Sequence, residues 1–398
     1  MCSVTSRTQV AIVGAGPAGL MLGHLLHRHG VDSVIIENRS EPHVIERVRA
    51  GVLEQGTVDL MRETGTGDRL EREGLRHDGF YIAFNGSRHR IDMAALTGGR
   101  AITIYGQNEV IKDLIDARRA TGRPLIFEAA DVSVGDLQSA QPVVRFTADG
   151  VAHELTCDFI GGCDGFHGVC RPSIPSTAMR IFERVHPFGW LGILADAPPS
   201  STELVYCLHE RGFALFSMRS TSITRLYLQC THDEDLSAWS DQRIWSELRA
   251  RLTTHDGWQP HVGPILQRGV TGMRSFVAEP MRYGRMFLAG DSAHIVPPTG
   301  AKGLNLAMAD VYRLAFAIAE FYRSGGEQLL ECYSERALQR TWRAQRFSFW
   351  MTTMLHQGDG HNPFDYRRQI ADLEYLFSSR AAMTSLAESY AGAPFDHE

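Results

Sequence analysis

The chain has 398 residues, of which 43% are hydrophobic and 22% charged, and its formal net charge is −6. No basic excess points to nucleic acid or to an anionic membrane surface, and no apolar stretch is long enough to span a bilayer. The seven cysteines form no CxxC pair, which argues against a disulfide framework and a zinc site. We therefore expect a cytoplasmic protein of two or three structural units, with reduced thiols and no metal.

The first predicted element is a βαβ unit over residues 8–37. Residues 10–13 form a short apolar run, and Gly14-Ala-Gly-Pro-Ala-Gly19 leads directly into an apolar helical pattern. Residues 31–36 form a second apolar run, which Glu37 ends. A GxGxxG motif between a strand and a helix, with an acid about 20 residues on, is typical of dinucleotide binding. A glycine-rich turn without a ligand is the alternative, and the strand, helix and acid together disfavour it.

The chemistry of this unit suits a nucleotide with two phosphates. The glycines allow a tight turn and a close approach of the backbone to a pyrophosphate at the helix N-terminus. The carboxylate of Glu37 can accept hydrogen bonds from a ribose hydroxyl, and its charge would repel a 2′-phosphate there.

The middle of the chain changes character. Residues 79–105 look strand-like, residues 108–120 helical, and a further buried strand ends at Asp164-Gly165. From residue 182 to residue 230, aromatic and polar residues alternate, and this period of two indicates an antiparallel sheet with two different faces. Residues 233–252 look helical.

A second signal for a nucleotide lies far along the chain. A buried strand ends in Gly290-Asp291, which presents a carboxylate to a ribose or polyol. A Pro-Pro-Thr-Gly loop and a long apolar helix from Gly303 follow, and the positive end of that helix could face an anionic ring oxygen of a reduced flavin. A conventional capped helix is the alternative. We predict a discontinuous nucleotide domain, with boundaries at 1–180, 181–274 and 275–398.

These segments, in this order, resemble the group A flavoprotein aromatic hydroxylases. The resemblance runs from TQVAIVGAGPAGL through RVRAGVLEQG, YGQ, GCDGFHG, ERVHPFGWLG, RSFVAEPM and GDSAHIVPPTGAKGLN to AESYAGAP. It implies an α/β fold, a discontinuous Rossmann-like FAD-binding domain with an inserted antiparallel-sheet substrate domain and a helical C-terminal region. It also implies 3-hydroxylation of 4-hydroxybenzoate through a flavin C4a-hydroperoxide, with bound FAD, NADPH or NADH as electron donor, dioxygen as co-substrate, and a homodimer.

The resemblance also implies which residues contact the cofactors. Ala18 stands where relatives carry Ser, and a backbone N–H could still serve there. Positions linked to nicotinamide are Arg49, His167 and Arg274. The implied FAD contacts are Gly14, Gly16, Ala18, Gly19, Glu37, Arg47, Val48, Arg49, Ala50, Gly51, Val52, Gln107, Asp164, Asp291, Leu304 and Asn305.

Three residues of the middle sheet form the expected carboxylate site. Ser217 and Arg219 alternate onto one face of a predicted strand, and Arg219 offers a planar bidentate fork. The resemblance implies Tyr227 as the third contact. Taken alone, each has a structural interpretation, because a strand Tyr is usually packing and a strand Arg is usually solvated.

The resemblance places the phenol of the substrate at Tyr206, with Tyr390 extending the hydrogen bond. It implies a backbone carbonyl from Pro298 near the same phenol and His77 at the outer end of a proton relay to solvent. Two alternatives stay open at this point. One is a related flavin hydroxylase acting on another benzoate, such as 4-aminobenzoate, and the other is a flavin-fold binding protein without turnover.

Overall fold

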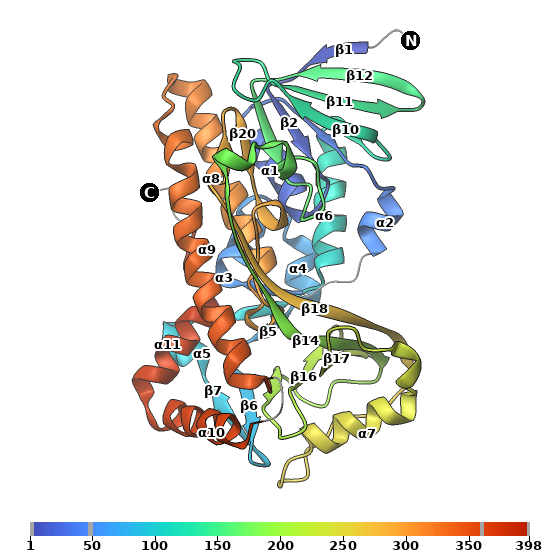
Figure 1. Cartoon of the computed structure of the whole chain (residues 1–398), viewed down its shortest axis with the longest axis vertical. Helices are drawn as coiled ribbons and strands as arrows, with labels where there is room; N and C mark the ends of the chain where they lie inside the picture. The colour runs from blue at the N-terminus through green and yellow to red at the C-terminus, as the bar shows by residue number, and fades with distance from the viewer. Residues whose placement is uncertain (1–3, 47–50, 359–361, 396–398) are drawn as a thin grey trace.

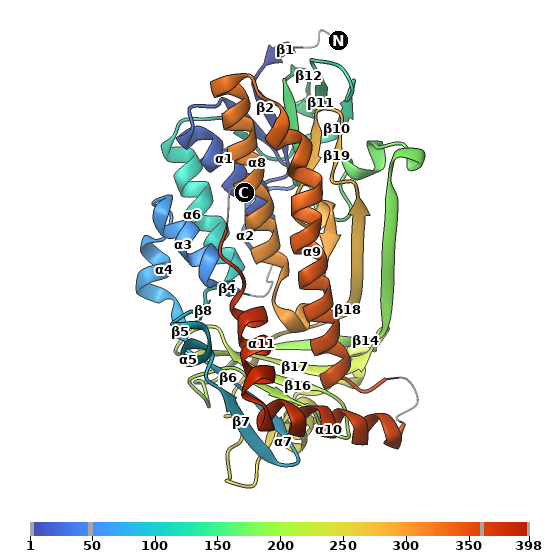
Figure 2. The same cartoon turned by 90° about the vertical axis from the view of Figure 1, so that its left-hand side faces the viewer.

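The computed structural model describes residues 4–46, 51–358 and 362–395. A mainly parallel sheet with its helices lies at one end of an elongated molecule, and a large antiparallel sheet lies at the other (Figure 1). The long helix α9 (Gln328–Leu355) runs beside both (Figure 2).

The parallel sheet is the predicted nucleotide fold. The strand β2 (Val10–Val13) pairs in parallel with β3 (Ser33–Ile36) and with β13 (Phe159–Gly162), and β13 pairs in parallel with β20 (Met286–Leu288). Because β20 follows every strand of the antiparallel sheet except the short β21 (His294–Ile295), the predicted discontinuity of this fold is confirmed. The sheet is completed by β9 (Leu125–Ile126) at one edge and β19 (Arg282–Tyr283) at the other.

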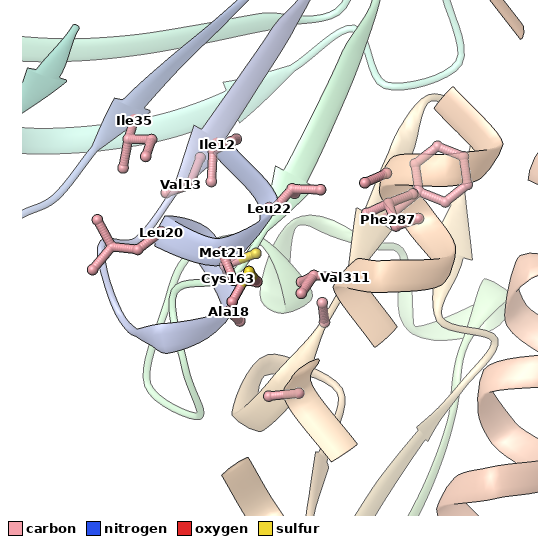
Figure 3. Packing of buried hydrophobic residues seen from close by; sticks show 14 of the residues in the cluster. Ile12, Val13, Ala18, Leu20, Met21, Leu22, Ile35, Cys163, Phe287 and Val311 are labelled. Carbon is pink, nitrogen blue, oxygen red and sulfur yellow. The ribbon is translucent and has the colours of Figure 1, made fainter. Parts of the chain in front are cut away.

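The core of this fold forms where α1 (Pro17–Arg28) packs against α8 (Gly303–Ser324). All four residues of β2 are buried, as expected for a strand covered on both faces. Figure 3 shows Ala18 and Met21 of α1 gathered with Cys163 near Val311 of α8. Burial of each large apolar side chain stabilises the fold by roughly 1.5–3 kcal/mol.

The antiparallel sheet has the strand order β21-β18-β14-β17-β16-β15-β6-β7. Its long ribbon is formed by β14 (Arg180–Asp196) and β18 (Ile265–Glu279). The other strands are β6 (Phe80–Phe84), β7 (Ser87–Ile91), β15 (Val205–Cys207), β16 (Ala214–Met218), β17 (Ile223–Thr231) and β21 (His294–Ile295).

The two faces of this sheet differ, as the period of two predicts. One face packs against α7 (Asp241–Leu252), and the other packs against α9, α10 (Pro363–Ser378) and α11 (Arg380–Ala391). Residues 80–91 join this sheet through parallel pairing of β6 with β15, so the antiparallel unit draws on sequence outside residues 181–274. The three domain boundaries remain predictions.

The remaining elements frame these two sheets. One further sheet has the order β1-β12-β11-β10 and another has the order β4-β8-β5. Their strands are β1 (Val4–Arg7), β4 (Val52–Glu54), β5 (Leu75–His77), β8 (Ile102–Ile104), β10 (Ala130–Gly135), β11 (Val143–Ala148) and β12 (Val151–Thr156). The other helices are α2 (Glu41–Glu46), α3 (Gln55–Glu63), α4 (Asp68–Glu73), α5 (Met93–Thr97) and α6 (Gln107–Ala120).

Within the described residues, no helix combines the length and apolarity that a membrane crossing needs. The same part of the chain contains no cluster of three or more His, Cys, Asp or Glu side chains placed to hold a metal ion.

Candidate active site

The three glycines of the turn after β2 have different surroundings. Gly14 has a φ of +105°, which favours glycine, and a side chain there would collide with the backbone of Cys163. A side chain at Gly19 would collide with the carbonyl of Gly14, so both glycines are required by protein packing. At Gly16, by contrast, a Cβ would meet nothing within 4 Å. The open side of the turn therefore leaves room for a pyrophosphate at the N-terminus of α1.

Glu37 lies beside this turn, as predicted. Its Oε2 accepts a hydrogen bond of 2.7 Å from the backbone N–H of Ala15, and its Oε1 accepts one of 2.9 Å from Arg39. An ionised carboxylate has about four acceptor positions, so acceptor capacity remains for a ribose hydroxyl.

The Gly290-Asp291 turn meets the glycine-rich turn in space. A Cβ on Gly290 would lie 3.5 Å from the Cβ of Ala18, although the two residues are far apart in sequence. The buried Asp310 accepts hydrogen bonds from the N–H of Gly290 at 2.9 Å and from Nε2 of His294 at 2.7 Å. This carboxylate holds the turn so that Asp291, which is half-buried, lies at the edge of the nucleotide fold.

The start of α8 is tied to the segment after residue 51 by Asn305. Its side-chain amide makes four hydrogen bonds of 2.8–3.0 Å, to Glu54 N, Thr57 Oγ1, Val52 O and Ala301 O. Because the side chain is saturated, the predicted flavin contacts of Leu304 and Asn305 fall to their backbone N–H groups. The first N–H groups of a helix have no partner within it and favour negative charge.

The other predicted FAD contacts vary in how they are placed. Gln107 is half-buried at the start of α6, and the carbonyl of Gly51 accepts from Tyr105 N at 2.9 Å. Asp164 holds the following turn, since its Oδ2 accepts from Cys170 N at 2.8 Å, and burial raises the pKa of this carboxyl. Four predicted contacts lie outside the described residues, namely Arg47, Val48, Arg49 and Ala50.

Two of the residues predicted to bind nicotinamide meet at one aromatic ring. The guanidinium carbon of Arg274 lies 4.7 Å from the ring centroid of Phe166, and the ring of His167 lies 5.0 Å from it. Arg274 also forms an ion pair of 3.4 Å with Glu183. The structure thus brings His167 and Arg274 together beside the ribbon of β14 and β18.

The expected substrate residues share one face of the antiparallel sheet. Tyr206 on β15 pairs with Leu215 on β16, Leu215 pairs with Tyr227 on β17, and Tyr227 pairs with Gly192 on β14. Ser217 lies on the same face two residues beyond Leu215, a step of about 6.6 Å along the strand. That step is comparable with the separation of the two para substituents of a benzene ring.

Arg219 connects this face with the cofactor fold. Its Nη1 lies 2.7 Å from the place where a Cβ on Gly51 would sit and 3.3 Å from the equivalent place at Gly106. Burial lowers the pKa of this guanidinium, while the ring hydroxyl of Tyr227 acts in the opposite direction. A desolvated cation therefore lies between the sheet and the segments predicted to contact FAD.

A pair of buried tyrosine hydroxyls lies at the other end of this face. The hydroxyls of Tyr206 and Tyr390 are 2.5 Å apart, and Tyr206 donates to the carbonyl of Thr299 at 3.2 Å. Burial raises the pKa of both tyrosines, so both hydroxyls are neutral at neutral pH. The ring of Phe80 stacks on Tyr390 at 4.5 Å. The carbonyl of Pro298 accepts from Ala301 N at 3.0 Å within the short turn η5 (Pro298–Gly300).

His77 is not in hydrogen-bond contact with either tyrosine. It is buried on β5, with Nε2 3.4 Å from the sulfur of Met218, and its Nδ1 has no partner within the described residues. Burial lowers the pKa of His77 to about 4, so the ring is neutral at neutral pH. The relay role of His77 remains a prediction.

Comparison with known proteins identifies the family of this chain. A family profile described as "FAD binding domain" covers residues 7–348. The p-hydroxybenzoate hydroxylase of Acinetobacter baylyi is 49% identical over 98% of this chain and 97% of that protein. The chain belongs to the FAD-binding flavoprotein aromatic hydroxylases.

Two more distant similarities were also found. The rifampicin monooxygenase of Streptomyces venezuelae is 28% identical, over 81% of this chain and 67% of that protein. A crystal structure of p-nitrophenol 4-monooxygenase from Pseudomonas putida superimposes with a TM-score of 0.83, covering 98% of this chain and 99% of that one. At 18% identity, this second likeness concerns the fold alone. The cofactor of the chain is FAD, as predicted, and the residues of the two turns fit it.

The glycines of the first turn allow a direct test of this cofactor site. Gly19→Ala is expected to destabilise the apoprotein by roughly 1–3 kcal/mol through overpacking and to weaken FAD retention. Gly16→Ala is expected to leave the unfolding temperature of the apoprotein unchanged and to weaken FAD binding only, because its Cβ would project toward the ligand. Apoprotein melting and titration with FAD, followed by flavin fluorescence, measure the two effects. Equal behaviour of the two variants would contradict this division of roles.

Several residues of this hydroxylase site were not predicted. The backbone carbonyl of Thr299 accepts a hydrogen bond from the hydroxyl of Tyr206. Arg225 lies two residues from Tyr227 on the substrate face, and its Nε is buried without a partner in the described chain. The ammonium group of Lys302 is buried between Glu54 and the carbonyl of Tyr390. Thr299 and Lys302 stand in the quoted GDSAHIVPPTGAKGLN motif, which was the available signal for both.

An aromatic pair also packs beside the substrate residues on the same face of the sheet. Nε1 of Trp190 donates to Nε2 of His356 at 2.7 Å, and Nδ1 of His356 lies 2.9 Å from the carbonyl of Thr352. Burial lowers the pKa of His356 to about 3, so this imidazole is a neutral acceptor. Trp190 packs on Tyr227 with ring centroids 4.7 Å apart. No sequence motif pointed to this pair.

Proposed function

We propose that this chain hydroxylates 4-hydroxybenzoate at ring carbon 3 and forms 3,4-dihydroxybenzoate. FAD is the cofactor, NADH or NADPH is the electron donor and dioxygen is the co-substrate. The observation that carries the proposal is the hydroxyl pair of Tyr206 and Tyr390 on the same sheet face as Ser217 and Arg219. The name of the Acinetobacter relative, p-hydroxybenzoate hydroxylase, agrees with this substrate.

The carboxylate of the substrate is assigned to Ser217, Arg219 and Tyr227. A guanidinium can hold a carboxylate with two parallel hydrogen bonds, and such charge-assisted bonds are about twice as strong as neutral ones. Because the pKa of Arg219 is lowered by burial, an anionic ligand restores a favourable environment for its charge. Tyr227 is held in place by its ring contact with Trp190.

The phenol of the substrate is assigned to Tyr206. When the phenol gives its proton to Tyr206, the hydroxyl proton of Tyr206 can move to Tyr390, whose oxygen is 2.5 Å away. The proton of Tyr390 must in turn pass on to solvent, with His77 as the predicted outer end of this path. Loss of the phenol proton raises the electron density at the ring carbon beside the phenol oxygen, which is the carbon to be hydroxylated. Bound FAD supplies the oxygen chemistry, in which nicotinamide gives two electrons and dioxygen gives one atom to the ring and one to water.

The site is enclosed by apolar side chains on the same face. Phe80, Phe213 and Leu215 are buried around Tyr206, and the helices α9 and α11 cover them. A closed, dry site strengthens its internal hydrogen bonds and limits side reactions with water.

One experiment separates the possible activities. Consumption of reduced nicotinamide that depends on 4-hydroxybenzoate, with an equal amount of 3,4-dihydroxybenzoate, supports the proposal. A stronger dependence on 4-aminobenzoate assigns the chain to another benzoate. Absence of turnover with either compound, despite bound FAD, leaves a flavin-fold binding protein.

Donor choice is the prediction that follows for the segment 38–43. We expect NADH to be used at least as well as NADPH, because Asn38 and His43 offer less fixed positive charge to a 2′-phosphate than an arginine-led segment. Glu41 forms an ion pair with Arg119. Arg39 is exposed and can supply part of the missing positive charge to a 2′-phosphate. The measurement is kcat/KM for both donors, with Arg39→Ala as the matched variant. A preference for NADPH of a hundredfold or more, about 2.7 kcal/mol, would contradict the prediction.

We also propose that the chain forms a homodimer and acts in the cytoplasm. Exposed apolar side chains on the ribbon and on α9 support a contact between copies. The rings of Phe182 and Trp342 lie 5.4 Å apart in an edge-to-face arrangement, with Ile181 and Val185 exposed nearby.

A further inference from the structure

The segment that follows Tyr390 is held by hydrogen bonds from arginine side chains to its backbone carbonyls. Tyr390 lies in the last turn of α11, and residues 392–395 continue beyond it; we name these four residues the C-terminal strap. The carbonyl of Gly392 accepts from Nη1 of Arg100 at 2.7 Å. Arg340 donates to the carbonyls of Ala393 at 2.7 Å and Pro394 at 3.0 Å.

A buried carboxylate connects these cations with Tyr390. Glu54 forms an ion pair with Lys302, whose Nζ also donates to the carbonyl of Tyr390 at 2.9 Å. The other oxygen of Glu54 lies 3.8 Å from Arg340. The carbonyl of Tyr390 and three carbonyls of the strap are therefore all held by positive side chains, two of which share Glu54.

The strap is also fitted sterically at both ends. Gly392 has a φ of +78°, and a side chain there would collide with the carboxylate of Glu54. Phe395 packs its ring 4.9 Å from the guanidinium carbon of Arg340 and 5.6 Å from the ring of Tyr312. These contacts leave the strap one path over the protein surface.

We propose that Arg100 and Arg340 are positioning residues that hold the hydroxyl of Tyr390 against Tyr206 through the C-terminal strap. The inference rests on the proposed function. Neither arginine is placed at the substrate or at FAD, and their hydrogen bonds go to the strap or, for Arg100, also to the carbonyl of Thr97. A contact as short as 2.5 Å between two hydroxyls depends steeply on the position of the helix end.

The test compares Arg100→Ala, Arg340→Ala and the double variant with wild type. Arg323→Ala serves as the matched control, because this exposed arginine pairs, within the described residues, only with Glu320 in the adjacent turn of α8. Three quantities are measured for each holoenzyme. They are the Kd for 4-hydroxybenzoate, the apparent pKa of the bound phenol from phenolate absorbance, and the ratio of dihydroxy product to nicotinamide consumed.

We expect the double variant to keep its Kd within about threefold, because the carboxylate site is at the other end of the sheet face. We expect its product ratio to fall roughly tenfold, since a displacement near 1 Å can cost about a hundredfold in rate. The pKa of the bound phenol should rise by about one unit, a tenfold change in the proton equilibrium. Arg340→Lys can reach one of the two carbonyls and should recover part of the loss.

Each outcome bears on one claim. An unchanged phenol pKa and product ratio in the double variant, with active wild type, overturns the positioning role. If the double variant does not fold, Arg100→Ala decides, because this side chain is half-exposed and contacts a single strap carbonyl. Wild type that forms no dihydroxy product overturns the proposed function instead.

Discussion

Tyr206→Phe is expected to consume reduced nicotinamide but to release hydrogen peroxide in place of 3,4-dihydroxybenzoate. The substitution removes the hydroxyl that faces Tyr390 and Thr299 but keeps the ring, which packs against Phe80 and Phe213 at 5.9 and 6.2 Å. Binding should survive, since the carboxylate contacts are untouched. Hydroxylation should slow by about a hundredfold or more, the usual contribution of a positioned proton acceptor.

The measurement for Tyr206→Phe is the ratio of dihydroxy product to nicotinamide oxidised. Tyr390→Phe should act in the same direction more mildly, because it lies one hydrogen bond further from the phenol. Tyr333→Phe is the matched control, since it removes another buried hydroxyl, which donates to the carbonyl of Leu288 at 2.8 Å in the nucleotide fold. A ratio near the wild-type value in Tyr206→Phe would refute the assigned proton path.

Arg219→Ala is expected to weaken binding of 4-hydroxybenzoate while FAD remains bound. Loss of a buried charge-assisted pair costs on the order of 2–5 kcal/mol, which corresponds to an increase in Kd of about 30-fold to several thousandfold. Arg219→Lys keeps the positive charge but loses the bidentate fork, so its affinity for 4-hydroxybenzoate should lie between those of wild type and Arg219→Ala. Titration of flavin absorbance with the substrate gives the affinities.

Two controls make the Arg219 result specific. Phenol lacks the carboxylate, so its affinity should be nearly equal in wild type and in Arg219→Ala. Arg243→Ala removes an arginine from α7 on the far side of the sheet, where it packs over Trp239, and should leave substrate binding unchanged. Because Arg219 touches Gly51 and Gly106, the FAD affinity is measured alongside. Unchanged affinity for 4-hydroxybenzoate in Arg219→Ala rules out the carboxylate assignment.

Local sequence was sufficient to predict the parts of the site that are built locally. The turn from Gly14 to Gly19 and the acid at Glu37 are joined by one βαβ unit, so strand, helix and turn signals within about thirty residues specify them. The period of two from residue 182 to residue 230 likewise predicted which side chains share a face, and β17 follows it.

The rest depends on contacts between distant segments, which local propensity does not encode. Tyr206 and Tyr390 are separated by 184 residues, and Lys302 and Glu54 by 248. The tyrosine pair was predicted only from the family resemblance, and the buried ion pair of Lys302 and Glu54 was not predicted. Parallel pairing of β6 with β15 was also missed, because a crossover of this length leaves no pattern in either strand.

The order of strands along the chain has a consequence for folding during synthesis on the ribosome. The nucleotide sheet needs β20, and the cofactor turns are completed by Gly290 and the start of α8. Since β13 emerges well before β20 and synthesis proceeds at roughly 5–20 residues per second, β13 waits several seconds or more for β20, its neighbour on the side away from β2. During that wait the edge of β13 is unpaired, and the antiparallel sheet is already complete except for β21. FAD capture is thus a late event in synthesis, and Tyr390 joins the site only after the cofactor turns have been made.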